Sequence, residues 1–158
     1  MVPGPARSAG RVIRTIHHMA TIFTKIIDGQ IPGTFVWRDE HCVAFMSINP
    51  IAPGHVLVVP RAEIDHWIDC PDDLVAHLYR VSHVIGRAQQ AAFPCERVGL
   101  IVAGFEVPHT HIHLIPTRSM ADLSFANAAA SVGREELGAS ANAIRAELVR
   151  VGRTEVSD

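Results

Sequence analysis

The order of strand-like and helix-like segments constrains the fold of this chain more than any other feature of its sequence. Segments rich in β-branched and aromatic residues come as a group of three and a group of two, separated by one long amphipathic segment. Because strands and helices do not alternate as they do in parallel sheets, the sequence predicts an α+β fold with a mainly antiparallel five-stranded sheet. The predicted strands cover residues 35–39, 42–48, 55–60, 97–104 and 107–116.

Three further segments carry apolar residues at helical spacing, and we predict two principal helices and a C-terminal helix. The first principal helix is expected at residues 21–30, and the second, with the longest apolar stripe, between Pro71 and Pro94. The strand at residues 55–60 is apolar on both faces, so we expect it to be central in the sheet. The C-terminal helix is expected at residues 134–151, with an apolar face of Leu137, Ile144, Leu148 and Val151.

The composition excludes several classes of protein. With 158 residues, 48% of them apolar and 19% charged, the chain suits a globular domain and not a disordered protein. A formal net charge of −2 provides no basic field, so we predict no nucleic-acid partner. No apolar run approaches the roughly 20 residues of a membrane span, so no membrane partner is predicted. The three cysteines lack paired spacing and any C-x-x-C motif, which favours a cytoplasmic protein.

A single domain is predicted at residues 19–151, followed by a tail at residues 152–158. Residues 1–18 contain three arginines, no acidic residue and no long apolar stretch. We expect them to form a disordered extension rather than a secretory signal.

The stretch HTHIHLIP places His109, His111 and His113 at alternate positions of the last predicted strand. Side chains two residues apart in a strand share a face and stand about 6 to 7 Å apart. We therefore expect the three rings to form a row, while the residues between them point toward the core. Over this distance, neighbouring rings can contact different oxygens of one phosphoryl group.

Three interpretations of this pattern remain open from the residues alone. With ten histidines in the chain, the spacing could arise by chance. H-x-H on a strand can also supply imidazole ligands to zinc, and a third histidine would complete a zinc site. In the third interpretation, a neutral imidazole attacks phosphorus, while neighbouring rings, partly protonated near neutral pH, stabilise the charge. We favour the third, because no nearby carboxylate suggests metal-bound-water chemistry.

Three motifs in this order, IFTKIIDGQIP, VAFMSINPIAPGHVLVVP and HTHIHLIP, resemble the histidine-triad (HIT) family, specifically its Hint-like branch. The resemblance covers residues 21–116, and the signature H-φ-H-φ-H-φ-φ, with φ apolar, has one departure at Thr110. It implies the HIT fold, a homodimer, a purine nucleotide substrate and no cofactor.

The resemblance also implies an activity: cleavage of nucleoside phosphoramidates or related phosphoanhydrides at the α-phosphate, by a hydrolase or nucleotidyl transferase. His111 would be the nucleophile and form a nucleotidyl-histidine intermediate, and His109 would orient it. His113 would help to bind the phosphate, and His55 matches a fourth histidine beside the triad. The resemblance also implies an apolar slot that binds the base; without the resemblance, its residues would simply be core residues. They are Ile22, Phe23, Ile26, Ile31, Phe45 and Ile48.

Several positions depart from the family pattern. Ser47 stands where many members have an aspartate that binds the ribose hydroxyls, so the nucleotide should be held less tightly. Phe105 replaces a glutamine, and Glu106 stands where eukaryotic members place a serine that helps to protonate the leaving group. Thr21 and Thr24 replace cysteines that bind zinc in some bacterial members. Two rivals follow: a nucleotide-binding module with little turnover, and a zinc-dependent hydrolase that uses the three-histidine strand.

The other histidines and the cysteines receive no functional role from the sequence. The histidines predicted to be structural or solvent-exposed are His17, His18, His41, His66, His77 and His83. The cysteines predicted to be small buried hydrophobic residues are Cys42, Cys70 and Cys95.

Overall fold

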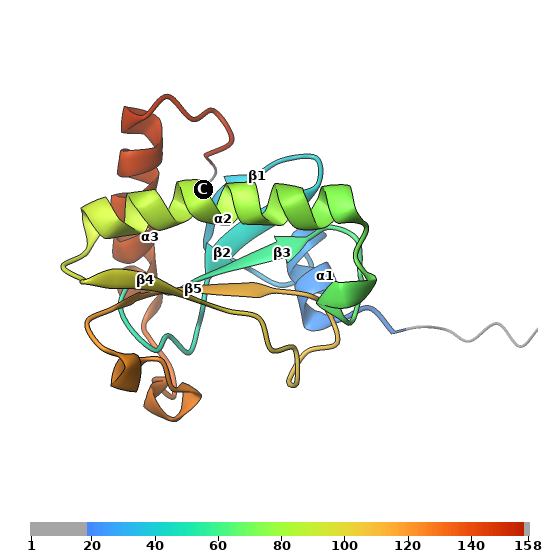
Figure 1. Cartoon of the computed structure of the whole chain (residues 1–158), viewed down its shortest axis with the longest axis horizontal. Coiled ribbons are helices and arrows are strands. Elements are labelled where there is room, and N and C mark those ends of the chain that lie inside the picture. The colour runs from blue at the N-terminus through green and yellow to red at the C-terminus, as the bar shows by residue number, and fades with distance from the viewer. Residues whose placement is uncertain (1–18, 157–158) are drawn as a thin grey trace, which may run out of the picture.

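The computed structural model describes residues 19–156 and confirms the predicted α+β fold. The strands form one antiparallel sheet in the order β1-β2-β3-β5-β4 (Figure 1). β3 (Val56–Pro60) is central and buried along its whole length, as predicted. The other strands are β1 (Phe35–Arg38), β2 (Cys42–Met46), β4 (Arg97–Ile101) and β5 (Ile112–Thr117). The predicted extension at residues 1–18, with His17 and His18, lies outside the described residues.

One face of the sheet carries the larger part of the core. α2 (Asp72–Ala92) crosses this face, and α3 (Arg134–Arg150) packs against α2 and β1 (Figure 1). Alternate strand residues point toward these helices, because successive side chains of a strand face opposite sides. Burial of each large apolar side chain stabilises the fold by about 1.5–3 kcal/mol. The fully buried members of this cluster include Val56, Val58, Ile85, Ile144 and Leu148.

The opposite face is partly covered by α1 (Ile22–Ile27). Phe23 of α1 packs there against Phe45 and Leu57, which alternate with the residues of the larger core. α1 has only six residues, so it covers only part of this face. It is shorter than predicted because Gly29, with a φ of 76°, turns the chain away from the helix.

The last strand differs from its predicted bounds, since it begins at Ile112 and not at residue 107. The backbone N–H groups just before this strand do not pair with a neighbouring strand. The Thr110 N–H donates to the Ile64 carbonyl at 2.7 Å, and the His109 N–H donates back to the Val107 carbonyl at 2.8 Å. The segment that carries His109 and His111 is therefore held by the loop after β3 rather than by a strand ladder.

Two smaller predictions were also wrong. β4 ends at Ile101 instead of residue 104. Val151 does not belong to the apolar face of α3, because it follows the last helical residue and is 54% exposed. The chain after α3 returns to β1, where the Glu155 carbonyl accepts a hydrogen bond from the Arg38 N–H at 2.8 Å.

Within residues 19–156, none of the helices has the length and apolarity to cross a membrane.

Candidate active site

The triad histidines lie on the same side of the sheet as α1. His113 belongs to β5, whereas His109 and His111 lie in the bent segment before it. His109 is completely buried, and His111 and His113 are 5% and 9% exposed. The ring centroids of His111 and His113 are 4.9 Å apart. Phe23 of α1 meets His111 edge-on at 5.0 Å, so helix and triad form one packed unit.

His109 is fixed by hydrogen bonds at both ring nitrogens. Its Nε2 lies 2.8 Å from the Pro60 carbonyl, which can only accept, so Nε2 carries the proton. Burial holds the pKa of this ring below its ordinary value, which keeps it neutral. Its Nδ1 therefore accepts the Thr21 hydroxyl proton at 2.9 Å. His109 thus has no ring nitrogen left for a substrate.

His111 has one ring nitrogen bound and the other available. Its Nδ1 lies 2.7 Å from the carbonyl oxygen of His109, so Nδ1 must carry the proton and donate it. Burial lowers the pKa of His111, and the ring is neutral near pH 7. Nε2 consequently presents an unprotonated lone pair.

His55 and His113 form a second chain of fixed protons. The Ile51 N–H donates to His55 Nδ1 at 3.0 Å, which leaves the proton of His55 on Nε2. His55 Nε2 then donates to His113 Nδ1 at 3.0 Å, so His113 carries its own proton on Nε2. A backbone amide thereby sets the tautomers of two rings in series and makes His113 Nε2 a hydrogen-bond donor.

Burial also decides the charge of these two rings. It lowers the pKa of His55 to about 4 and, together with the neighbouring His111 and His55, that of His113 to about 3. The expectation of partly protonated neighbours near neutral pH is therefore wrong for the protein without substrate. His113 meets an incoming anion as a neutral donor.

A cavity of about 820 Å³ opens beside the triad on the α1 side of the sheet. His111, His113 and His55 line it, whereas His109 and Ile31 do not. The other residues predicted to bind nucleotide all line it: Ile22, Phe23, Ile26, Phe45, Ser47, Ile48 and Glu106. Ile22 and Ile48 are 46% and 65% exposed, so these two belong to an open slot and not to a closed core.

The positions that depart from the family pattern fall into two groups. Ser47 and Glu106 line the cavity, and the charge of Glu106 acts on the His111 ring. Phe105 does not line it, and its side chain is 96% exposed. The change at residue 105 therefore removes nothing from the cavity wall, while residues 47 and 106 can change how a ligand is held.

The sequence prediction missed Phe125, Arg134 and Asn49. The Phe125 ring meets His113 edge-on at 4.9 Å and closes one side of the cavity. Arg134 is the one lysine or arginine among the described lining residues. Phe125 lies in a segment without strand or helix periodicity, and Arg134 is the first residue of α3. Neither residue belongs to a recognised motif. Only the Asn49-Pro50 turn gave a signal, and it indicated a turn rather than a site.

The arrangement of the rings does not suit a three-histidine zinc site. His109 uses both nitrogens within the protein, and His113 uses Nδ1 to bind His55. Only His111 Nε2 and His113 Nε2 remain for the cavity, and a zinc site requires at least three protein ligands. Thr21 and Thr24, which stand in place of zinc-binding cysteines, connect α1 to Glu63. The Glu63 carboxylate accepts hydrogen bonds from the Thr21 N–H and the Thr24 hydroxyl.

This chain is similar in sequence to several known proteins. The family model of the HIT domain matches residues 28–120. A HIT-like protein of Methanocaldococcus jannaschii is 38% identical over 99 residues, which cover 60% of this chain and 77% of that protein. The protein named hit of Bacillus subtilis is 36% identical over 108 residues, 64% of this chain and 73% of that protein. An adenylylsulfatase, HINT3, of Arabidopsis thaliana is 30% identical over 102 residues, 61% of this chain and 52% of that protein.

Solved structures share the fold. A Hit-like protein of Bartonella henselae superposes with a TM-score of 0.73 at 28% identity, over 81% of this chain and 96% of that one. A HIT family hydrolase of Legionella pneumophila has a TM-score of 0.55 at 34% identity, over 64% of this chain and 96% of that one.

Proposed function

Because this chain belongs to the HIT family, we propose that it is a nucleotide hydrolase or nucleotidyl transferase with His111 as its nucleophile. Its proposed substrates are purine nucleotides that carry an amine or a second acid on the α-phosphate, namely nucleoside phosphoramidates and related phosphoanhydrides. The names of two relatives, an adenylylsulfatase and a HIT family hydrolase, support a hydrolytic activity.

One observation carries the proposal: the hydrogen bond from His111 Nδ1 to the His109 carbonyl. It leaves the Nε2 lone pair at the wall of the cavity, where a phosphorus atom can approach. The same carbonyl would stabilise the positive charge that the ring acquires when Nε2 bonds to phosphorus. Since the ring is already in the reactive tautomer, no proton has to move before the attack.

The reaction has two steps. In the first, His111 Nε2 forms a bond to the α-phosphorus, the bond to the leaving group breaks, and that group takes up a proton. In the second, a water oxygen attacks phosphorus and loses a proton, the N–P bond breaks, and the nucleoside monophosphate leaves. His113 Nε2–H is the proposed donor to a phosphoryl oxygen in both steps. Glu106, at the exposed rim of the cavity, is the proposed proton carrier.

The base is proposed to lie between the exposed side chains of Ile22 and Ile48, above the rings of Phe23 and Phe45. Flat apolar surfaces of this kind favour a large aromatic base such as a purine. Ser47 offers a single hydroxyl to the ribose, so we expect weak binding of the sugar.

The test is mass spectrometry of protein quenched during turnover of adenosine phosphoramidate. We expect an adenylyl group on His111 in the wild-type protein and none in His111→Ala, with cleavage reduced by at least about a thousandfold. The matched control is His83→Ala, which removes an exposed histidine on α2 and should turn over normally. A wild-type adduct on another residue would contradict the assignment.

The same variants distinguish the proposed enzyme from the rival interpretation, a nucleotide-binding module with little turnover. It predicts AMP binding in both wild type and His111→Ala, with no cleavage in either. The proposal predicts comparable AMP binding in both but cleavage in the wild type only.

We further propose a homodimer in the cytoplasm. β4 is an edge strand with a neighbour on one side only, and Leu100 in it is 41% exposed. Such an edge suits pairing with the same strand of a second copy. The three unpaired thiols suit a reducing compartment.

A further inference from the structure

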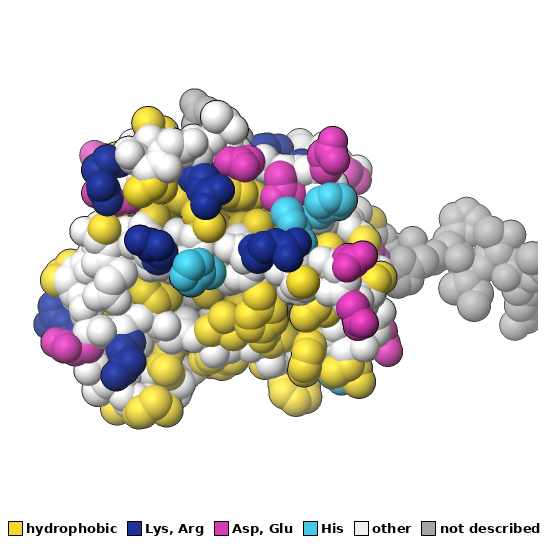
Figure 2. Space-filling model, turned by 45° about the horizontal axis from the view of Figure 1, so that its top comes forward, with side chains coloured by type: hydrophobic (Ala, Val, Ile, Leu, Met, Phe, Trp, Pro, Cys, Tyr) yellow, Lys and Arg dark blue, Asp and Glu magenta, His cyan; other side chains and the backbone are white. Residues whose placement is uncertain are grey.

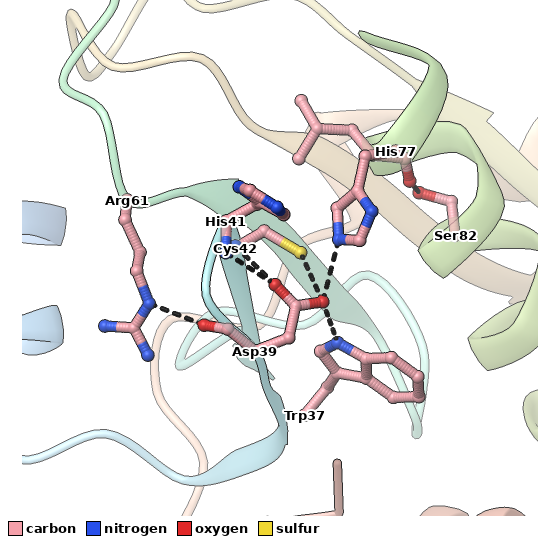
Figure 3. Close-up of polar contacts among 8 residues, drawn as sticks. Trp37, Asp39, His41, Cys42, Arg61, His77 and Ser82 are labelled. Atoms are coloured by element: carbon pink, nitrogen blue, oxygen red, sulfur yellow. Dashed lines mark hydrogen bonds and ion pairs between the residues drawn. The ribbon is translucent and has the colours of Figure 1, made fainter. Parts of the chain in front are cut away.

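A second polar cluster lies on the other side of the sheet, where the β1–β2 hairpin meets α2. The turn of this hairpin carries Asp39 and His41, Cys42 is the first residue of β2, and α2 contributes His77. Figure 3 shows the Asp39 carboxylate at the centre, with the His77 ring, the Cys42 sulfur and the Trp37 indole directed at it. None of these residues takes part in the proposed reaction.

The donor atoms are spaced as ligands of a tetrahedral ion would be. Those of Asp39, Cys42 and His77 all lie within 4.8 Å of one another. Cys42 Sγ is 3.6 Å from Asp39 Oδ2, and zinc bonds of ordinary length would set sulfur and oxygen about 3.5 Å apart. His77 Nε2 is 2.8 Å from the same oxygen and would retreat by about half an ångström to reach ligand spacing.

His41 lies beside the three converging residues and would have to turn its ring toward them to become a fourth ligand. Its exposed ring meets the His77 ring edge-on, with centroids 5.0 Å apart. Asp39, His41 and His77 all line a cavity of about 450 Å³ that opens to solvent, so an ion has a route to the cluster. Figure 2 shows histidine side chains gathered beside acidic ones on this surface.

We propose that Asp39, Cys42 and His77, with His41 as a fourth ligand, form a binding site for one divalent transition-metal ion of the zinc type. Thiolate, imidazole and carboxylate are each donors that zinc binds. Among residues 19–156, this is the one group of three such side chains whose ligand atoms converge. The site is separate from the triad cavity and does not depend on the proposed activity.

Protons must leave for the ion to bind. Cys42 releases its thiol proton to water, and the proton that His77 now donates from Nε2 to Asp39 moves to Nδ1. Asp39 binds as a carboxylate and releases no proton. Trp37 Nε1 donates to Oδ2 at 2.7 Å and would orient the carboxylate from outside the site.

The experiment is a titration of the chelator-treated full-length protein with Co²⁺, which occupies zinc sites and absorbs light. We expect one Co²⁺ per chain with a thiolate-to-cobalt charge-transfer band. Cys42→Ser should abolish the band. His77→Gln keeps a side-chain amide that can bond to Asp39 but lacks the imidazole, and it should weaken Co²⁺ binding at least about tenfold.

Two controls make the result specific. His83→Gln changes another histidine on the wall of the same cavity and should leave the titration unchanged. His111→Ala removes the proposed nucleophile of the triad, and the charge-transfer band should persist. Zn²⁺ should raise the melting temperature of the wild type and not that of His77→Gln, a readout that holds even if Cys42→Ser fails to fold. Absence of the band in the wild type, or its survival in Cys42→Ser, would overturn the proposal.

Discussion

At the candidate active site, single backbone groups decide where the protons of the histidine rings lie. The Ile51 N–H sets the order of protons through His55 and His113, and the His109 carbonyl does so for His111. Each ring is buried enough to stay neutral near pH 7. The reactivity of these residues therefore depends on tautomer rather than on charge.

His55 makes the stability of the fold depend on pH. Its pKa is about 4 in the folded protein and 6.5 when unfolded, so the unfolded chain binds a proton first as the pH falls. The contribution of His55 to the free energy of unfolding is complete above pH 6.5, declines between pH 6.5 and 4, and amounts to about 3 kcal/mol. Urea denaturation at several pH values measures it. His55→Gln should reduce the slope and not remove it, because His109, His111 and His113 are also buried with lowered pKa values. His83→Gln should leave the slope unchanged, and identical slopes for wild type and His55→Gln would refute this origin.

Ser47 should limit how tightly the nucleotide is held. Ser47→Asp adds a carboxylate at the cavity wall that can accept hydrogen bonds from both ribose hydroxyls. We expect the KM for adenosine phosphoramidate to fall by about tenfold, with a smaller change in kcat. Steady-state kinetics measure this. The control is a substrate without the two ribose hydroxyls, which should gain nothing; an equal gain would place the effect elsewhere.

At the scale of elements, the hydroxyl group of Thr21 joins the start of α1 to the triad by a hydrogen bond, in addition to the packing of Phe23. Thr21 Oγ1 accepts from the Thr24 N–H as the helix cap and also donates to His109 Nδ1. Thr21→Val removes both bonds and leaves a buried ring nitrogen unpaired, so we expect a loss of about 2 kcal/mol in the free energy of unfolding. Thr21→Ser keeps the hydroxyl and should lose much less. Chemical denaturation of the wild type and the two variants measures these free energies of unfolding.

The elements also show how far sequence patterns reach. The apolar character of β3 and the stripe of α2 predicted a central strand and a long helix, because burial imposes these patterns directly. The segment at 107–111 has a strand-like alternation without being a strand, because its backbone N–H groups bond to Val107 and Ile64 and not to a neighbouring strand, a choice that alternation does not reveal.

Prediction of the sites was limited for the same reason. The triad stands in one short stretch, so its alternation drew attention to it. His55 needed the family resemblance. The sequence predicts His77 to be structural or exposed. Its contact with Asp39, 38 residues earlier, is not predictable, because no local pattern connects a hairpin turn to the face of a helix. Cys95 also departs from its prediction, since it is only partly buried.

At the scale of the whole molecule, the proposed dimer should depend on the open edge of the sheet. Leu100→Lys places a charge in β4, and edge charges prevent strand pairing. We expect at least about a tenfold weaker dimer, with the monomer still folded. Light scattering during size-exclusion chromatography measures the mass. Val149→Lys changes an exposed residue of α3 and should leave the mass unaltered; equal masses for both variants and the wild type would argue against this interface.

The two margins of the sheet are unlike each other. At β1, the Glu155 carbonyl bonds to the Arg38 N–H, and the Arg145 guanidinium bonds to the Phe35 carbonyl, so the protein's own C-terminal part occupies backbone groups that face outward. A chain with one free sheet edge can pair with one other chain there, and in a symmetric dimer the free edges of both chains are paired with each other. Growth into a fibre is thereby terminated at the first step.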